Sequence, residues 1–188
     1  MEFSHEVLRR HLPPNARVLD TTAGNGYDTR FLLDIADDGG LVLAIDIQQS
    51  AVDATIARIA AHPRAGQAEV VMCAHSNLEQ LLLEKSWLNL HGAIMNCGYL
   101  LGGDKSIRTN AQTTELALHT LIKFLAKGGV LCVVCYTGHD GGIEERDVVR
   151  DLCWGLSKDV YHCSHYANLG RQNAPECFII ERRSDPND

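Results

Sequence analysis

The chain has 188 residues, of which 45% are hydrophobic and 22% charged, and its formal net charge is −7. This length suits one domain with a substantial core, so we expect a single domain over residues 1–188. The sequence has no apolar run of membrane-spanning length and no hydrophobic signal region, which predicts a cytoplasmic protein with no membrane partner. The negative charge argues against binding of long nucleic acid by electrostatics alone, but leaves open a compact RNA that meets a local basic patch. The candidates for such a patch are Arg9, Arg10, Arg17, Lys105, Arg108 and Arg171.

Seven cysteines, an odd number, are scattered along the chain, which indicates reduced thiols and no disulfide framework. Cys132 and Cys135 have the spacing of a zinc knuckle, but they lie in an apolar run that is typical of a buried strand. Residues three apart in a strand point to opposite faces, and the same holds for His162 and His165. We therefore expect no metal site.

Apolar spacing and breaker residues predict helices and strands that alternate along the chain. Pro13 ends the first helix, Ser50 caps the third, and Gly128-Gly129 end the fifth. Helices are expected at residues 3–12, 27–36, 50–61, 78–85, 113–126 and 144–153. Strands are expected at residues 16–20, 41–46, 70–72, 92–96, 130–136, 159–166 and 176–182.

This order of elements predicts an α/β fold. Five strand–helix units are followed by two strands without a long crossover helix, which indicates a mainly parallel seven-stranded sheet with an antiparallel C-terminal hairpin and helices on both faces. This Rossmann-like architecture is that of class I methyltransferases. Ligands of such sheets lie beyond the carboxyl ends of the strands, and glycine-rich loops follow the first, fourth and fifth strands. One site built from three distant segments is expected.

The first glycine-rich loop narrows the choice of ligand. It lacks the Gly-Lys-Ser/Thr ending of a Walker loop, and Thr29 stands where a pyrophosphate fingerprint would have its third glycine. Asp20 precedes the loop, and Asp46 ends the next strand, where ribose hydroxyls are commonly held. Because Asp20 would repel a pyrophosphate but suits an amino group and a sulfonium, S-adenosylmethionine fits better than a dinucleotide. Other Rossmann-like proteins stay open as an alternative at this point.

Four segments, in order, carry a resemblance to a known family. They are Gly24-Asn25-Gly26 with Asp28-Thr29, Asp46-Ile47-Gln48, Asn96-Cys97-Gly98-Tyr99-Leu100 with Gly102-Gly103-Asp104-Lys105-Ser106, and Tyr136 with Gly138-His139 and Gly141-Gly142. From Asp20 to its end the chain resembles the small bacterial methyltransferases of the YtqB or MnmM type, once described as rRNA methylases. It departs from them at Ala23, Tyr27 and Leu101, where the family often has Cys, His and Pro.

The resemblance implies a substrate and a cofactor. The family methylates the aminomethyl group of 5-aminomethyl-2-thiouridine at the wobble position of tRNA, so the implied cofactor is S-adenosylmethionine and the implied partner is the anticodon region of tRNA. Methyltransferases acting on rRNA, small molecules or proteins stay open, as does a non-catalytic Rossmann-like binding module. A homodimer is a further expectation, because it would enlarge an RNA-binding surface.

The resemblance also implies which residues bind the cofactor. Asp20 and the glycine loop would line its methionine end, Asp46 would hold the ribose, and His75 and Ser76 follow the third strand, where this fold commonly contacts the adenine. A plain tight turn and an exposed strand-end acid are the alternatives for the glycines and Asp46. The expected cofactor-binding residues are Asp20, Gly24, Asn25, Gly26, Asp28, Thr29, Asp46, Gln48, His75, Ser76 and Asn96.

Asn96 and Tyr99 are expected nearest the transferred methyl group. Methylation of an amine is an in-line displacement, so the amine must be neutral and its lone pair aimed at the methyl carbon. We expect the Asn96 carbonyl to orient the amine, Tyr99 to pack on the base or exclude water, and Asp104 or His139 to accept the surplus proton. The alternative for Asp104 is a helix-capping acid. The expected catalytic residues are Asn96, Tyr99, Asp104 and His139, and the expected substrate-binding residues are Tyr99, Gly102, Gly103, Lys105, Ser106, Tyr136 and Arg171.

Overall fold

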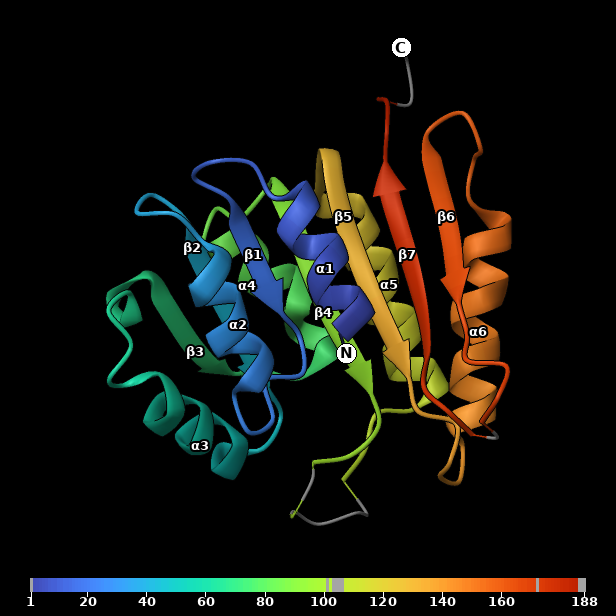
Figure 1. The fold of residues 1–188 in the computed structure, drawn as a ribbon, viewed down its shortest axis with the longest axis horizontal. Coiled ribbons are helices and arrows are strands. Elements are labelled where there is room, and N and C mark those ends of the chain that lie inside the picture. The colour runs from blue at the N-terminus through green and yellow to red at the C-terminus, as the bar shows by residue number, and fades with distance from the viewer. Residues whose placement is uncertain (1, 101, 103–106, 172, 186–188) are drawn as a thin grey trace.

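The computed structural model describes residues 2–100, 102, 107–171 and 173–185 (Figure 1). Within them the helices and strands alternate as expected. In chain order the elements are α1 (Glu2–His11), β1 (Arg17–Asp20), α2 (Tyr27–Ile35), β2 (Leu41–Asp46), α3 (Gln49–Ile59), β3 (Ala68–Met72), α4 (Leu78–Glu84), β4 (Leu90–Cys97), α5 (Ala111–Phe124), β5 (Leu125–Cys135), α6 (Gly142–Gly155), β6 (Tyr161–Tyr166) and β7 (Glu176–Arg182). Short 3-10 turns cover Ala65–Gln67 and His75–Asn77.

The strands form one seven-stranded sheet in the order β3-β2-β1-β4-β5-β7-β6. Neighbours from β3 to β5 are parallel, whereas β7 is antiparallel to both β5 and β6. The chain first moves outward from β1 to β3 and then returns to place β4 on the other side of β1. This reversal creates a switch point between β1 and β4, where ligands of such sheets bind. The predicted fold class is confirmed.

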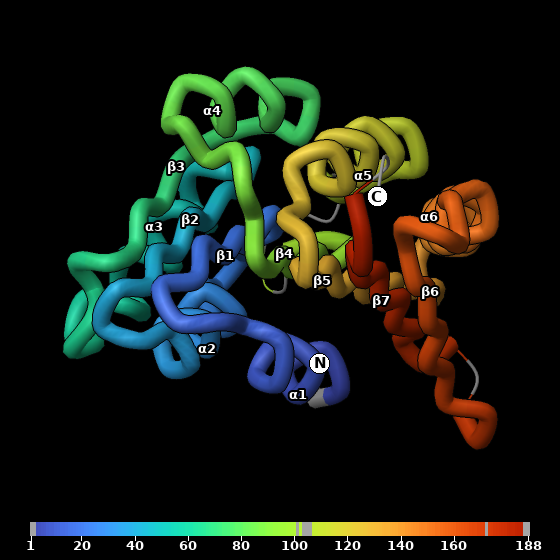
Figure 2. The backbone as a smooth tube through the Cα atoms, turned by 90° about the horizontal axis from the view of Figure 1, so that it is seen from above, coloured from blue at the N-terminus to red at the C-terminus, as the bar shows by residue number. Residues whose placement is uncertain are grey.

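Helices cover both faces of the sheet, which produces three layers (Figure 2). One core joins α1, α2 and α3 to the sheet through apolar side chains such as Leu8, Leu32 and Ile59. The other core joins α4, α5 and α6 to the opposite face. Cys132 belongs to the first core and Cys135 to the second. The prediction that these two cysteines point to opposite faces is therefore confirmed.

The expected cap at Ser50 is wrong. Helix α3 begins at Gln49, and its N-cap is Gln48, which has extended backbone and makes no side-chain cap hydrogen bond. Ser50 therefore lies within the first turn and is exposed. The helix starts early because the backbone N–H of Gln48 already donates to Asp46 Oδ1 at 2.9 Å, which turns the chain directly after β2.

The expected end of the fifth helix at Gly128-Gly129 is also wrong. Helix α5 ends at Phe124, and β5 begins at Leu125, which pairs with Leu90 of β4. Both glycines therefore lie inside a strand with an irregular register. A Cβ at Gly129 would lie only 2.7 Å from the Leu90 carbonyl oxygen, so the close approach of β4 explains why a glycine stands there.

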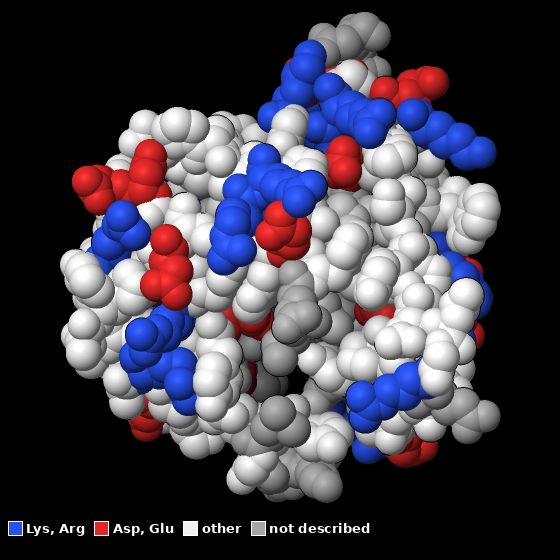
Figure 3. Space-filling view, in the orientation of Figure 1, with Lys and Arg blue, Asp and Glu red and all other residues white. Residues whose placement is uncertain are grey.

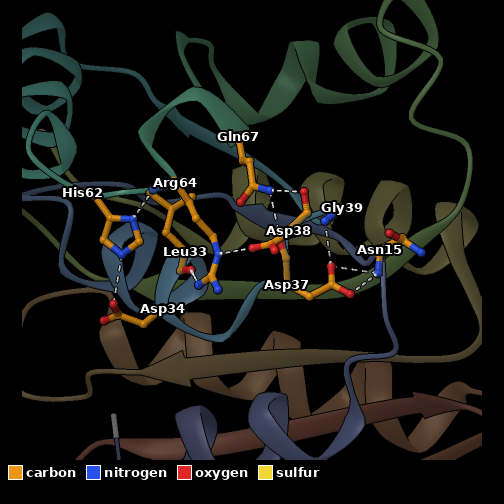
Figure 4. A network of polar contacts seen from close by, with 9 residues as sticks. All are labelled: Asn15, Leu33, Asp34, Asp37, Asp38, Gly39, His62, Arg64 and Gln67. Carbon is orange, nitrogen blue, oxygen red and sulfur yellow. Dashed lines mark hydrogen bonds and ion pairs between the residues drawn. The ribbon is translucent and has the colours of Figure 1, made fainter.

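A polar network fastens the amino ends of β1, β2 and β3 (Figure 4). The Asp37 carboxylate accepts the backbone N–H groups of Asn15 at 3.0 Å and Gly39 at 3.1 Å. Gln67 donates to the carbonyl oxygen of Asp38 at 2.6 Å, and Arg64 donates to its carboxylate at 3.3 Å. This network stabilises the edge of the sheet opposite the carboxyl ends of these strands, so it lies away from the expected site.

In the described part of the chain, no helix combines the length and the apolar character needed to cross a bilayer. The same residues contain no cluster of three His, Cys, Asp or Glu side chains arranged to hold a metal ion. His165 instead contacts Glu176 at 2.8 Å, and His162 lies 3.8 Å from Glu181. All seven cysteines are free thiols.

Candidate active site

A cavity of about 550 Å³ opens at the carboxyl ends of the parallel strands. Its lining comes from the segments that follow β1, β2, β3, β4 and β5, together with Asn173 from the β6–β7 connection. Figure 3 shows the surface hollowed below its centre, with acidic atoms visible in the hollow and basic side chains to either side. Several distant segments therefore form one site at the switch point, and its volume is typical of a small-molecule or cofactor pocket.

The glycine loop after β1 forms one wall of this cavity. Gly24 has φ 55°, a left-handed conformation that favours glycine, and its backbone N–H donates to Asp46 Oδ2 at 2.9 Å. Asp46 is half-buried and also accepts the Gln48 N–H, so its two oxygens hold the ends of both β1 and β2. A carboxylate has about four lone-pair sites, and these two bonds leave acceptor capacity toward the cavity. Asp46, Gln48, Gly24 and Asn25 all line the cavity as expected.

Asp20 lies beneath the wall and is not part of the cavity lining. Its side chain is fully buried, where it accepts the Thr22 N–H at 3.1 Å and the Thr29 hydroxyl at 2.6 Å. Alternation along β1 explains this position: Leu19 faces the α4–α6 core, so Asp20 faces the other side of the sheet, under the start of α2. The expected direct contact between Asp20 and a ligand is not supported, and Asp20 instead supports the loop.

Gly26 and Thr29 also lie outside the lining. Gly26 has φ 76°, and a Cβ there would lie 2.8 Å from Thr55 Cα, so it allows α2 and α3 to approach closely. The expectation that these two residues contact the cofactor is likewise not supported. Their role in the structure is to fix the turn that carries Gly24.

Burial, followed by the nearby charge of Asp28, raises the pKa of Asp20 from 3.8 to about 7. The two hydrogen bonds from Thr29 and Thr22 oppose this shift. A carboxyl group that changes protonation near neutral pH therefore lies directly below the glycine loop.

His75 and Ser76 line the cavity on a 3-10 turn after β3. His75 Nε2 lies 2.9 Å from the Thr21 carbonyl oxygen, and because a carbonyl only accepts, Nε2 carries the proton. Burial lowers the pKa of His75, which favours the neutral ring. His75 therefore connects the end of β3 to the glycine loop.

Asn96 stands at the end of β4 and faces the glycine loop. Its backbone N–H donates to the Thr22 hydroxyl at 2.8 Å, and its Nδ2 donates to Asp28 Oδ2 at 2.6 Å. Its Oδ1 is buried and has no hydrogen-bond partner. Because a buried polar atom without a partner is costly, this oxygen is a candidate acceptor for a ligand in the cavity.

Tyr99, Tyr136 and His139, from the segments that follow β4 and β5, also line the cavity. The Tyr99 and His139 rings meet edge to face with centroids 5.9 Å apart. His139 Nδ1 lies 3.0 Å from the Asp140 carbonyl oxygen and must donate to it, which leaves a lone pair on Nε2. That Nε2 is buried and unpartnered. Burial, followed by the charge of Asp28, raises the pKa of Tyr136 and keeps its hydroxyl protonated.

Two expected substrate-binding residues lie outside this cavity. Gly102 is exposed with φ 83°. Arg171 is exposed beside a second hollow, between the start of α6 and the β6–β7 connection. The predictions for Gly103, Asp104, Lys105 and Ser106 fall outside the described residues.

Two residues that line the cavity were not among the expected cofactor-binding or substrate-binding residues, although Arg108 was a candidate for the basic patch. Tyr27 lines the cavity and is 60% exposed, and the Arg58 guanidinium lies 3.6 Å from the centroid of its ring. Arg108 also lines the cavity, and it forms a 2.8 Å ion pair with Asp140 that joins the β4–α5 and β5–α6 connections. Tyr27 follows the glycine loop directly, which was an available signal. Nothing in the local sequence around Arg108 pointed to its partner.

Fold and site together define a class I methyltransferase. The sequence model of the family described as "Putative rRNA methylase" matches residues 42–182. A chloroplastic tRNA (mnm(5)s(2)U34)-methyltransferase from Arabidopsis thaliana is 33% identical over 193 aligned residues, which cover 98% of this chain and 69% of that protein. The chain belongs to the family described as "Putative rRNA methylase", and it is an S-adenosylmethionine-dependent methyltransferase.

Solved structures agree with this assignment. A protein described in the same words as the family, from Clostridium thermocellum, superposes with a TM-score of 0.89 at 28% identity, with 96% of each chain covered. A "putative methyltransferase" from Streptococcus mutans in complex with SAH superposes with a TM-score of 0.84 at 27% identity, again with 96% of each chain covered.

Proposed function

We propose that this protein transfers the methyl group of S-adenosylmethionine to the aminomethyl group of 5-aminomethyl-2-thiouridine at the tRNA wobble position. The observation that carries the proposal is the buried, unpartnered Oδ1 of Asn96, a residue that lines the cavity at the switch point. The name of the Arabidopsis relative supports the choice of tRNA.

The cavity fits the cofactor. Gly24 brings backbone close to the space, and the remaining lone pairs of Asp46 suit the two hydroxyls of a ribose. The adenine end of the cofactor would lie between Gln48, His75 and Ser76. The methionine end would lie along the backbone of Gly24 and Asn25. When bound, the cofactor supplies a methyl group on a positively charged sulfur, whose carbon–sulfur bond breaks as the new carbon–nitrogen bond forms.

Asn96 would orient the amine. Its Oδ1 accepts one N–H of the neutral amine, which leaves the nitrogen lone pair free to point along the line of displacement. The unpartnered Nε2 of His139 is the described group that suits the last step, because its lone pair accepts the proton released by the methylated amine. Asp104 is the other proposed acceptor. Tyr99, which meets the His139 ring, would pack on the base and exclude water.

RNA binding by an acidic protein requires local basic side chains. Strand β6 runs parallel to β5, so the β6–β7 connection returns to the edge where the cavity opens. Arg171 is exposed on that connection, and Arg108 lies at the cavity itself. We assign phosphate contacts to Arg171, with the base entering the cavity next to Tyr99.

The test uses purified protein, S-adenosylmethionine with a labelled methyl group, and tRNA from cells that lack the wobble methyl. Mass spectrometry of the digested nucleosides should find the label on 5-methylaminomethyl-2-thiouridine, and Asn96→Ala should abolish most of it. The family description favours rRNA as a second candidate. Label in rRNA with none in tRNA would support that candidate and overturn the proposal.

A further inference from the structure

We propose that His5 and Asp28 are positioning residues that hold the Asn96 amide with its oxygen toward the reacting amine. This inference rests on the proposed function, because it explains how the acceptor in the cavity is oriented. Neither residue needs to touch the transferred methyl group. Both act through Asn96.

Asp28 lies in the first turn of α2, and its side chain is 8% exposed. One carboxylate oxygen accepts Nδ2 of Asn96 at 2.6 Å, and the other lies 2.5 Å from Nε2 of His5. The carboxylate therefore joins the N-terminal helix to the end of β4. It has a donor on each oxygen, which satisfies a buried charge from two sides.

This arrangement selects one orientation of the amide. A carboxylate accepts hydrogen bonds but cannot donate them, so the NH2 group of Asn96 turns toward Asp28 and Oδ1 turns away. A flipped amide would set oxygen against oxygen and present a donor to the cavity. Such a donor would compete for the amine lone pair that must remain free for the displacement. The backbone of Asn96 is held separately by its bond to Thr22.

His5 fixes Asp28 in turn. Its ring stacks on Phe31 with centroids 3.6 Å apart and an angle of 3° between the planes, which leaves Nε2 in the ring plane facing the carboxylate. His5 contributes no atom to the cavity lining. A residue of α1 would thus influence the reaction without touching the substrate, through a single carboxylate.

Two substitutions of His5 separate its two contacts. His5→Phe keeps a ring that can stack on Phe31 and removes the donor to Asp28. His5→Gln removes the ring and keeps an N–H donor of similar reach. His11→Phe on the same helix is the control, because His11 contacts Val7 and Glu181, away from the cavity.

The first experiment measures two quantities for each variant: kcat with tRNA as substrate, and the affinity for S-adenosylhomocysteine. We expect His5→Phe to lower kcat roughly tenfold, the effect of losing one hydrogen bond to a charged group. His5→Gln should restore most of that loss, and neither variant should change the affinity for S-adenosylhomocysteine. Asp28→Asn should lower kcat further, roughly a hundredfold, because an amide partner no longer fixes the orientation of Asn96.

The second readout does not depend on turnover. The side-chain amide of Asn96 gives its own nitrogen–proton NMR signal, which its loss in Asn96→Ala identifies. That signal should move in Asp28→Asn and His5→Phe, and stay in place in His5→Gln and His11→Phe. An unmoved signal with unchanged kcat in His5→Phe would overturn the positioning role. So would an equal loss of kcat in His5→Phe and His5→Gln with the signal unmoved.

Failure of the proposed function looks different from failure of this inference. If the unchanged protein transfers no methyl group to tRNA, the proposed substrate is wrong. The NMR signal of the Asn96 amide then still decides whether His5 and Asp28 hold it.

Discussion

The carboxylate of Asp46 accepts the backbone N–H of Gly24 at 2.9 Å and so joins the end of β2 to the glycine loop of β1. This bond gives Asp46 a second task beside the ribose contact proposed for it. Its other oxygen holds Gln48 at the start of α3. The shape of the cofactor pocket therefore depends on one side chain at the end of β2.

Removal of that side chain should weaken cofactor binding. In Asp46→Ala the Gly24 and Gln48 N–H groups lose their acceptor, and we expect the dissociation constant of S-adenosylhomocysteine to rise at least roughly tenfold. Isothermal titration calorimetry measures it. Asp53→Ala, an exposed acid on α3, is the control and should bind normally. Equal affinities in the two variants would show that Asp46 does not contribute to cofactor binding.

Asp20 predicts a pH dependence of folding. Its pKa in the folded protein is about 7 against 3.8 for the free side chain, so only the folded state retains the proton between these values. Stability therefore falls as pH rises from about 4 to 7, by up to a few kcal/mol. Asp20→Asn, which cannot ionise, should lack this loss and gain stability relative to the unchanged protein as pH rises. Urea unfolding at pH 5 and pH 8 measures the free energy of unfolding of both proteins. The same change between the two pH values in both proteins would contradict the raised pKa of Asp20.

Gly26 should tolerate no side chain. Its φ of 76° is left-handed, and a Cβ would meet Thr55 Cα at 2.8 Å. We expect Gly26→Ala to lower the free energy of unfolding by about 2 kcal/mol or more. Gly66→Ala is the matched control, since a Cβ at Gly66 meets nothing within 4 Å. Thermal or urea unfolding compares them, and similar midpoints would refute the close approach of α2 and α3.

Arg171 should contribute to RNA affinity but not to cofactor affinity. We expect Arg171→Glu to weaken tRNA binding and to reduce the slope of log affinity against log salt by about 1. Lys158→Glu carries the same charge change at an exposed position before β6, at the far end of the sheet. Binding measured at several salt concentrations distinguishes the two. An equal response in both variants would show a general charge effect and no contact at Arg171.

The sequence predicted well those features that glycines and alternating patterns define locally. The bounds of β2 and β7 agree with the expected residues, and the loop carrying Gly24 lies beside Asp46 as the fold class requires. Asn96 and His139, which are far apart in the chain, meet in one cavity because parallel strands end at one edge.

Features that depend on long-range contacts were missed. The sequence places an acid at position 20, but only the packing of α2 shows that Thr29 covers it. The pattern of α1 predicts which residues face the core, and says nothing of a contact between His5 and Asp28, 23 residues further on. In β5, pairing of Leu125 with Leu90 prevailed over a helical pattern that continued past it.

The most direct measurement of the central claim is single-turnover methyl transfer by Asn96→Ala. The experiment uses tRNA that lacks the wobble methyl, with binding of S-adenosylhomocysteine measured beside it. If the Asn96 oxygen orients the amine, the rate should fall roughly a hundredfold, while affinity for S-adenosylhomocysteine stays within about threefold, less than 1 kcal/mol. A rate close to that of the unchanged protein, with binding intact, would contradict the account.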